Sequence, residues 1–565
     1  MRAVPEAFGG GRRKYLPRLI LNGAAQAGAA VVLAAASARL FGPALDGPMA
    51  ASGLAQALLA PALLLIGALA GLGWLRRRER IDAEQLGQDY VCEIRVGAFD
   101  HLSRLSLRAH GRLRKGALML RFVNDLTALR QWISLGIARM VVAGLLATGC
   151  FAGLIVLSPL VGVAAASVVW LGGLTILAMS WRLDRVIREA RRRRGRLAAA
   201  LGERLQRLAA TNALARRGAE RRKVKKLSRR LARAMVARAG SIGAMRAIAQ
   251  VTIGLAGAAA LIAGAFGRAS GLAEAGDVVA AMSVVAIMTG PLADLGRVYE
   301  YWRGARIARA KLETLFAAGP VILQPASPKR FDARTPAIEF REASVAHAIE
   351  TLSARIEFGE RVFLSGPNGA GKSTILYLVS RLIDADSGTV MIGGETITGV
   401  GLGALRRTVS IVSPEIGLFR GGLAENILAR ADRLPENFDE ICEACGIERV
   451  DPSAALHIDR VVDEGGANLS FGERARAGLA RALCGTPKIL LLDEADAYLD
   501  AASRDVLKRV IEGFAGTVIA VTHDPQLMAL ADKIWRIHDG RLIHIDAGAP
   551  RAASPGRFVH LAPAP

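Results

Sequence analysis

The sequence predicts a multi-domain membrane protein, in which an all-α domain of six membrane-spanning helices precedes an α/β domain. Three observations support this fold class. The chain has 565 residues, more than one ordinary core accommodates. Hydrophobic residues make up 52% of it although the formal net charge is +24, so apolar and basic residues are expected in different segments. Long apolar stretches fill the first half, and a strand, Gly-rich loop and helix pattern lies in the second.

Six apolar stretches in the first half predict six transmembrane helices. They lie at 19–38, 49–75, 140–157, 160–181, 247–266 and 278–292. Most reach the roughly twenty residues that a helix needs to cross the hydrocarbon core. The last is short, but its apolar face can continue past Pro291. A buried core helix is the alternative for any single stretch, and six in series favour the membrane.

Basic residues around these stretches predict the topology. Lys and Arg precede the first span, follow the second at 76–80 and fill 182–246, whereas the connections near 40–48, 158–159 and 267–277 are short and nearly uncharged. The positive-inside rule then places both chain ends in the cytosol. No cleavage site follows the first apolar stretch, which we interpret as an uncleaved span. We expect a multi-pass protein of the cell's inner (plasma) membrane, with its second half in the cytosol.

The basic runs at 191–194 and 221–226 indicate contact with membrane lipid rather than nucleic acid. They lie on long predicted cytosolic helices, where each basic residue gains about 1 kcal/mol near anionic headgroups. Aromatic residues that could stack on bases do not interleave with them, so no nucleic-acid partner is expected.

Cysteine usage indicates neither a disulfide framework nor a metal site. The five cysteines are scattered, and the CEAC sequence at 442–445 lacks the second ligand pair of a zinc site.

A composition change divides the chain. The predicted membrane domain covers 1–315, a proline-bearing linker covers 316–336, the soluble domain covers 337–545, and we expect the tail at 546–565 to be disordered.

The soluble domain contains, at 361–379, the pattern RVFLSGPNGAGKSTILYLV, which has the strand, Gly-rich loop and helix of a P-loop NTPase. Backbone N–H groups of such a loop cradle phosphates, a lysine reaches the outer phosphates, and a hydroxyl binds Mg²⁺. The residues expected to bind the nucleotide are Gly366, Pro367, Asn368, Gly369, Ala370, Gly371, Lys372, Ser373 and Thr374.

Two further strand ends carry candidate catalytic residues. KILLLDEADAYLD ends a predicted buried strand in Asp493 and Glu494, and His523 follows the strand in VIAVTHDP. Asp493 suits the Mg²⁺ shell together with Ser373, Glu494 could polarise the attacking water, and His523 could hold the terminal phosphate. Ligands of open α/β sheets gather at this carboxyl edge, so ATP and Mg²⁺ are the expected cofactors.

The order of P-loop, LSFGE, ILLLDE and His523 resembles the ATP-binding-cassette (ABC) ATPases, and the six-span half resembles their type I exporter membrane domain. In the membrane half, GALMLRFVNDLTALRQ at 116–131 and the Pro291–Leu292 pair are similar to the family pattern. Glu464 resembles the family's exporter-type loop that senses the membrane domain.

The resemblance implies a dimer, in which the signature of one subunit closes over ATP held by the P-loop of the other. By position, Ser470 and Gly472 would then face the partner's terminal phosphate, and Asp500 matches the dimer-contact loop. His347 falls where the family stacks an aromatic ring on adenine; a loop histidine without a ligand is the equal alternative.

The sequence departs from the family pattern at three positions. Phe471 and Glu473 replace a glycine and a glutamine of the usual LSGGQ signature. A Cβ is costly where positive φ is needed, and a carboxylate near phosphate repels it. Pro414 replaces a glutamine and can neither bind Mg²⁺ nor donate a hydrogen bond, unless Glu415 substitutes.

These observations favour an ATP-driven exporter half that works as a dimer with a second half-transporter subunit. Because the P-loop is intact and the signature is altered, the partner could be a different chain, which would leave one weak ATP site. The alternative is a membrane-embedded regulator or scaffold that binds ATP with little transport. A soluble ABC ATPase is disfavoured by the six spans. Few ionisable residues lie at mid-depth, which favours an amphipathic cargo whose identity the sequence leaves open.

Overall fold

The computed structural model describes residues 4–46, 51–111, 118–119, 121–431, 434–451, 453–454, 456–497 and 499–548. The chain forms two compact units: Met1–Ser103 with Leu113–Ala318, and Arg104–Arg112 with Gly319–Pro565. Parts of the 40–48 connection, the 116–131 pattern and the predicted tail lie outside the described residues.

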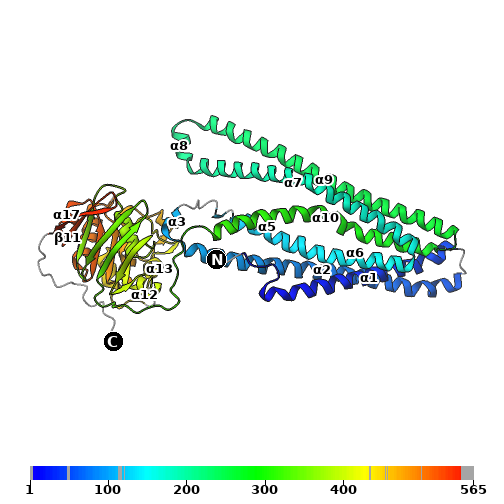
Figure 1. Cartoon of the computed structure of the whole chain (residues 1–565), viewed down its shortest axis with the longest axis horizontal. Helices are drawn as coiled ribbons and strands as arrows, with labels where there is room; N and C mark the ends of the chain where they lie inside the picture. The colour runs from blue at the N-terminus through cyan, green and yellow to red at the C-terminus, as the bar shows by residue number, and fades with distance from the viewer. Residues whose placement is uncertain are drawn as a thin grey trace. The chain divides into compact units, whose positions relative to one another are not determined.

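Long helices build the first unit (Figure 1). After η1 (Gly10–Lys14) they are α1 (Tyr15–Asp46), α2 (Ala51–Ser103), η2 (Arg121–Asp125), α5 (Leu126–Gln131), η3 (Trp132–Ile137), α6 (Ala138–Leu157), α7 (Pro159–Gln206), α8 (Leu208–Ala213), α9 (Arg217–Ala269) and α10 (Ala275–Phe316).

The described residues of each of the six predicted apolar stretches lie in one of these helices; residues 49–50 of the second stretch lie outside the described residues. Within the described residues, five helices are long and apolar enough to cross a membrane. The sixth apolar segment, Ala275–Pro291, is shorter than a full span. It nevertheless belongs to the continuous helix α10, which contains Pro291 and extends to Phe316. The helical membrane domain is confirmed, whereas the count of six complete spans is not.

Helices α7 and α9 pair along their length, and α8 joins them at one end (Figure 1). Small residues permit this close packing, because a Cβ built on Gly172 would lie 2.2 Å from the side chain of Thr252. The basic runs continue along this pair, where Arg193 pairs with Glu189 and Arg204 with Glu220. These long helices therefore carry the arginine-rich segments on a hairpin.

The second unit contains two main sheets. One is antiparallel, with the order β2-β1-β4-β5, and the other has the order β12-β11-β3-β10-β9-β6; β7 and β8 form a small pair. The strands are β1 (Ile338–Val345), β2 (Ile349–Ile356), β3 (Arg361–Ser365), β4 (Ser387–Ile392), β5 (Glu395–Thr396), β6 (Val409–Val412), β7 (Gly421–Gly422), β8 (Val461–Val462), β9 (Ile489–Asp493), β10 (Thr517–Val521), β11 (Lys533–His538) and β12 (Arg541–Ala547).

Helices cover the larger sheet. They are α11 (Lys372–Val379), α12 (Leu402–Thr408), α13 (Leu423–Leu428), α14 (Phe438–Ala444), η4 (Glu464–Gly466), α15 (Phe471–Cys484), α16 (Ala501–Gly513) and α17 (Pro525–Met528). Strands β9 and β10 are buried at every position, as expected for parallel strands that are covered on both faces. The buried Trp535 meets Phe340 edge to face with ring centroids 6.1 Å apart, within the usual range of about 4.5–7 Å, and so joins the two sheets.

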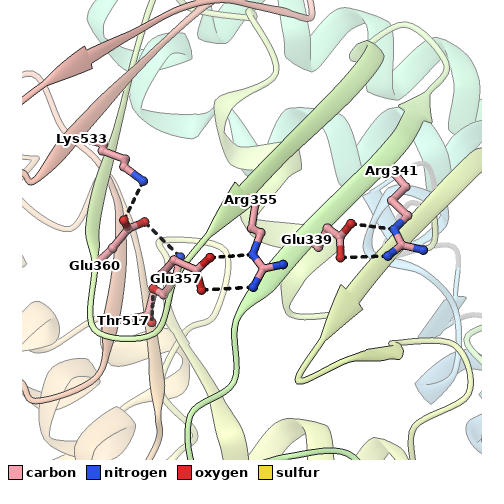
Figure 2. A network of polar contacts seen from close by, with 7 residues as sticks. All are labelled: Glu339, Arg341, Arg355, Glu357, Glu360, Thr517 and Lys533. Carbon is pink, nitrogen blue, oxygen red and sulfur yellow. Dashed lines mark hydrogen bonds and ion pairs between the residues drawn. The ribbon is translucent and has the colours of Figure 1, made fainter.

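Charged residues cover the outer surface of the antiparallel sheet. Figure 2 shows Arg341 bound to Glu339 through two hydrogen bonds, and Arg355 bound to Glu357 in the same way. Glu339 lies opposite Arg355 in the register of β1 and β2. Such exposed pairs contribute little stability each, but they keep this face polar.

The segment Arg104–Arg112, which the sequence analysis placed in the membrane domain, packs with the second unit and contains α3 (Leu107–Gly111). The Leu107 amide donates to the Leu382 carbonyl at 2.9 Å, and the Ser106 amide donates to the Pro320 carbonyl at 3.0 Å. Arg108 donates to the Ala346 carbonyl at 2.6 Å. This short piece of the first half is thus fixed to the α/β unit by backbone hydrogen bonds.

Candidate functional site

The P-loop leaves β3 and enters α11 through glycines that no other residue could replace without strain. Gly366, Gly369 and Gly371 all have positive φ. A Cβ on Gly366 would lie 2.0 Å from the Ile537 carbonyl oxygen, and one on Gly371 would lie 2.3 Å from the Ala348 carbonyl oxygen. The predicted strand, loop and helix are therefore present, and the loop leaves its backbone free of side chains for a phosphate to approach.

Lys372 lies at the start of α11 and is buried. Its Nζ donates to the carbonyl oxygens of Gly366 at 2.7 Å and Pro367 at 2.9 Å. Burial lowers the pKa of this ammonium group, whereas the nearby carboxylates of Glu494 and Asp493 oppose that shift. The lysine is thus held beside the loop in the position where its charge can meet a phosphate.

Asp493 ends β9 and accepts three side-chain hydroxyls. The Ser373 hydroxyl donates to Oδ1 at 2.7 Å, and those of Tyr377 and Ser413 donate to Oδ2 at 2.9 and 3.1 Å. The structure therefore brings together the two predicted Mg²⁺ residues, Ser373 and Asp493. The sequence analysis missed Tyr377, because a tyrosine in an apolar helix is expected to belong to the hydrophobic core.

This donor set fits a magnesium ion and a nucleotide. A hydroxyl and a carboxylate are the hard oxygen ligands that Mg²⁺ prefers in phosphate sites. They lie next to a glycine cradle that any Cβ would fill and next to the buried cation Lys372. When bound, the ion supplies charge neutralisation of the outer phosphates.

Glu494 and His523 follow neighbouring parallel strands. Strands β9 and β10 pair with Asp493 opposite Val521, so both strands end at the same edge. Glu494 has φ +49°, a conformation that is costly for a residue other than glycine, and its amide donates to the Val521 carbonyl at 3.1 Å. Both predicted catalytic side chains are exposed. Their roles stay predictions. The strand before His523, β10, lies next to the P-loop strand β3, and the strand before Glu494, β9, lies one strand further away.

His347 lies in the tight turn between β1 and β2, with φ +64° and an exposed ring. The next residue, Ala348, contacts the P-loop glycine Gly371 through its carbonyl oxygen. The ring thus belongs to a turn beside the phosphate loop. Stacking of this ring on adenine stays a prediction, as does the alternative of a loop histidine without a ligand.

The altered signature begins helix α15 without strain. Ser470 is the N-cap, and its hydroxyl accepts from the Glu473 amide at 3.2 Å. The Glu473 carboxylate accepts from the Ser470 amide at 2.8 Å and pairs with Arg460 at 3.0 Å. This reciprocal arrangement is a capping box. These contacts partly neutralise the Glu473 carboxylate and so weaken the repulsion that a phosphate would meet there.

Phe471 is the first residue of α15 and is absent from the residues with positive φ, so the expected backbone strain is not present. Its ring is 59% exposed, and the Arg474 guanidinium lies 4.4 Å from the ring centroid. At the adjacent position, a Cβ on Gly472 would lie 2.4 Å from the Ser503 hydroxyl, so only glycine fits. The remaining consequence of Phe471 is steric, an exposed ring beside Ser470.

Asp500 caps α16 and lies next to the signature. Its carboxylate accepts from the Ser503 amide at 2.9 Å, and hydrogen bonds from Ser503 lower the pKa of Asp500. The same Ser503 limits the space at Gly472. The predicted dimer-contact aspartate and the signature therefore form one local surface.

The loop after β6 lacks the side chain that the family pattern predicts. Pro414 and Glu415 are exposed, and the Glu415 amide donates to the Ser413 hydroxyl at 3.3 Å. Ser413 follows Val412, which pairs with Leu492, and so lies opposite Asp493. The departure at Pro414 is real, and a neighbouring hydroxyl contacts the carboxylate instead.

A second candidate site is a cavity of about 730 Å³ in the membrane unit. Its lining includes the polar residues Gln26, Glu79, Arg76, Arg139 and Asp294, which flank the spans. Apolar residues also line it, namely Leu33, Leu65, Leu69, Val142, Leu146 and Ile287. Among the polar residues Arg139 pairs with Asp294 at 2.6 Å, and Gln26 donates to Glu79 at 2.8 Å. The cavity lining therefore combines charged and apolar residues.

Comparison with known proteins identifies both units. The family model described as ABC transporter matches residues 349–497, and the model described as ABC transporter transmembrane region matches residues 20–292. A solved structure titled "Structure of a bacterial Atm1-family ABC exporter with ATP bound" superposes with a TM-score of 0.82 and 23% sequence identity. The match covers 95% of this chain and 96% of that one, which establishes a shared fold.

Similar sequences include transporters of several kinds. The chain is 26% identical over 475 residues to "Uncharacterized ABC transporter ATP-binding protein YfiB" of Bacillus subtilis, covering 82% of this chain and 81% of that protein. It is 30% identical over 312 residues to "Beta-(1-->2)glucan export ATP-binding/permease protein NdvA" of Rhizobium johnstonii, covering 53% of each.

A third relative, "ABC multidrug transporter mdr1" of Aspergillus fumigatus, is 31% identical over 270 residues. The match covers 46% of this chain and only 20% of that longer protein. The sequence order, the P-loop geometry and the two family matches lead to one conclusion. The chain belongs to the ABC transporters, and it joins their transmembrane region to their ATP-hydrolysing domain.

Proposed function

We propose that this chain is one half of an ATP-driven exporter and works as a dimer with a second half-transporter subunit. One observation carries the proposal. The P-loop packs against the Ala348 turn and Ile537, whereas the signature packs against α16 and the Arg460 side chain. A single chain thus presents the two halves of an ATP site on different elements, and a second subunit can complete each half.

The proposed chemistry follows from the edge of the sheet. Lys372 and the loop amides would hold the phosphates of ATP, and Ser373 with Asp493 would hold Mg²⁺. Glu494 would orient the attacking water, and His523 would contact the terminal phosphate. The positive φ of Glu494 supports this assignment, because such strain persists where the surrounding structure enforces it, often at functional sites.

We further propose that the helical unit lies in the cell's inner (plasma) membrane and that the ATPase unit lies in the cytosol. The arginine-rich hairpin of α7 and α9 supports this orientation, because basic residues favour the cytosolic side. Its exposed arginines are suited to anionic lipid headgroups.

The cargo that the cavity fits best is amphipathic. A charged group would meet Arg76 and the Arg139–Asp294 pair, and an apolar part would lie along Leu65 and Leu146. The test compares how strongly two alkyl compounds stimulate ATP hydrolysis, one with an anionic head group and one without a charged head group. Arg76→Ala should weaken stimulation by the anionic form, with Arg77→Ala as the matched control outside the lining. Equal stimulation by both alkyl compounds would contradict this cargo class.

We infer that the partner is a different chain with an intact signature. The exposed Phe471 ring would meet a partner's ATP if the signature closes on it, whereas the hydrogen bonds of Lys372 and Asp493 support an intact P-loop side of the site. The alternative is a membrane-embedded regulator that binds ATP with little transport, which Pro414 and Phe471 favour. An intact candidate base, Glu494, favours the exporter.

The experiment that tests the function is Glu494→Gln. Loss of the base should reduce ATP turnover by about 10² to 10⁴, while Lys372 and Ser373 keep ATP bound. Steady-state hydrolysis and retention of labelled ATP are measured on the chain purified with its partner. Glu440→Gln, an exposed acid on α14, serves as the control. Unchanged hydrolysis in Glu494→Gln would contradict the catalytic assignment, and absence of hydrolysis in the wild type would favour the regulator.

A further inference from the structure

The Asp493 carboxylate is held by more donors than the P-loop pattern itself provides. Its Oδ1 accepts the hydroxyl of Ser373, the P-loop residue that is predicted to share the Mg²⁺ site with Asp493. Its Oδ2 accepts the hydroxyls of Tyr377 at 2.9 Å and Ser413 at 3.1 Å. These two hydroxyls lie 3.4 Å from each other. The side of the carboxylate away from Ser373 is thus clamped by a pair of hydroxyls.

Local structure explains why both hydroxyls arrive there. Tyr377 follows Ser373 by four residues on α11, so the two side chains lie on one face of the helix, one turn apart. Ser413 follows the last residue of β6, and β6 pairs in parallel with β9 so that Val412 lies opposite Leu492. Ser413 consequently lies opposite Asp493 at the carboxyl edge. A helix and a neighbouring strand bring the two hydroxyls to the same oxygen.

The clamp lies next to the position where the chain departs from its family. Pro414 follows Ser413 and offers no side-chain oxygen to a metal ion. Fewer protein oxygens are then available to fix Mg²⁺, so the orientation of Asp493 matters more. Outer contacts of this kind hold a metal ligand in its productive orientation. Tyr377 is half-buried and Ser413 is buried, so both bonds are shielded from water.

We propose that Tyr377 is a positioning residue for the magnesium site, acting with Ser413 to hold Asp493 where the Pro414 loop supplies no ligand. This inference rests on the proposed ATP site. The Tyr377 and Ser413 hydroxyls then strengthen nucleotide binding only when Mg²⁺ is present, and the P-loop accounts for the binding that does not need Mg²⁺. Loss of an outer-shell partner typically costs 10- to 100-fold in metal affinity. We expect about tenfold for one of two hydroxyls.

The test measures binding of a fluorescent ATP analogue to the full chain in Mg²⁺ and in EDTA. The ratio of the two dissociation constants reports how much Mg²⁺ strengthens nucleotide binding. Tyr377→Phe should reduce this ratio about tenfold and leave the dissociation constant in EDTA unchanged. Ser413→Ala should act in the same direction. Ser410→Ala is the matched control, because the buried Ser410 hydroxyl bonds the Ala482 carbonyl rather than Asp493.

The outcomes separate the possible errors. A wild-type chain that does not bind the analogue would overturn the proposed function together with this inference. A wild-type chain that binds, with an unchanged or larger ratio in both Tyr377→Phe and Ser413→Ala, would overturn only the inference. Equal losses in Mg²⁺ and EDTA would also overturn it, because Tyr377 would then support the packing of the P-loop alone. If Tyr377→Phe fails to fold, Ser413→Ala decides by the same ratio.

Discussion

Replacement of Glu473 by alanine should open the first turn of α15, because Glu473 holds that turn closed. The substitution removes the acceptor for the Ser470 amide, a charge-assisted hydrogen bond of 2.8 Å that contributes about 1.5 kcal/mol. It also removes the ion pair with Arg460, which adds about 1 kcal/mol because only 12% of the Glu473 side chain is exposed. The sum of about 2.5 kcal/mol corresponds to roughly 60-fold more frequent local opening.

Hydrogen exchange followed by mass spectrometry on peptides that cover 468–476 measures this opening. Glu473→Gln keeps one acceptor for the Ser470 amide and loses only charge, so its exchange should rise about tenfold. Glu440→Ala on α14 should leave these peptides unchanged. Equal exchange in wild type and Glu473→Ala would refute the capping role, and the carboxylate would again be available to repel a phosphate.

Two further predictions follow from the signature and the charge pattern. Phe471→Gly, with Glu473 left in place, should raise the ATPase rate of the isolated chain by at least about tenfold. The reason is that one recovered hydrogen-bond donor to the phosphate can contribute roughly 2.7 to 4 kcal/mol. If the wild-type chain already hydrolyses ATP at family-like rates and Phe471→Gly does not raise the rate, a homodimer is favoured. Cysteines placed at Leu272, which is exposed between α9 and α10, should react with an impermeant reagent from outside the cell, whereas those at Arg192 should not. Reaction at Arg192 from outside would overturn the topology.

The sequence was sufficient to predict the two kinds of domain. It also assigned Ser373 and Asp493 to one Mg²⁺ site, and the structure places their side chains within hydrogen-bond distance of each other. Apolar length predicts membrane helices, and the P-loop pattern includes the strand and helix that position it. Helix α10 was harder to assign as a span, because its apolar segment ends near Pro291 while the helix continues to Phe316. Composition predicts where the apolar segment ends. It does not predict how far the backbone hydrogen bonds of the helix continue beyond that segment.

Side-chain partners from distant parts of the chain could not be predicted. Glu473 suggested repulsion of phosphate, since nothing in LSFGE indicates that Arg460 lies within 3.0 Å of it. Tyr377 gave no signal as a hydrogen-bond donor, because its partner Asp493 lies 116 residues away. The i, i+4 spacing of Ser373 and Tyr377 was the one available sign. A sequence motif identifies the residues that contact the ligand. The residues that orient those side chains are brought to them by tertiary packing, which the motif does not contain.

If the chain is an exporter, ATP binding at Lys372 should open the cavity of the membrane unit to the outside. Ser283 lines that cavity, and Cys92 is the one exposed native cysteine, so Cys92→Ser serves as the background for labelling. The decisive measurement is the rate at which an impermeant maleimide labels Ser283→Cys from outside intact cells, where any partner subunit is present. We expect faster labelling in Glu494→Gln, which should retain ATP, than in Lys372→Ala, which should not bind ATP. Equal rates in the two variants would contradict the exporter and favour the regulator.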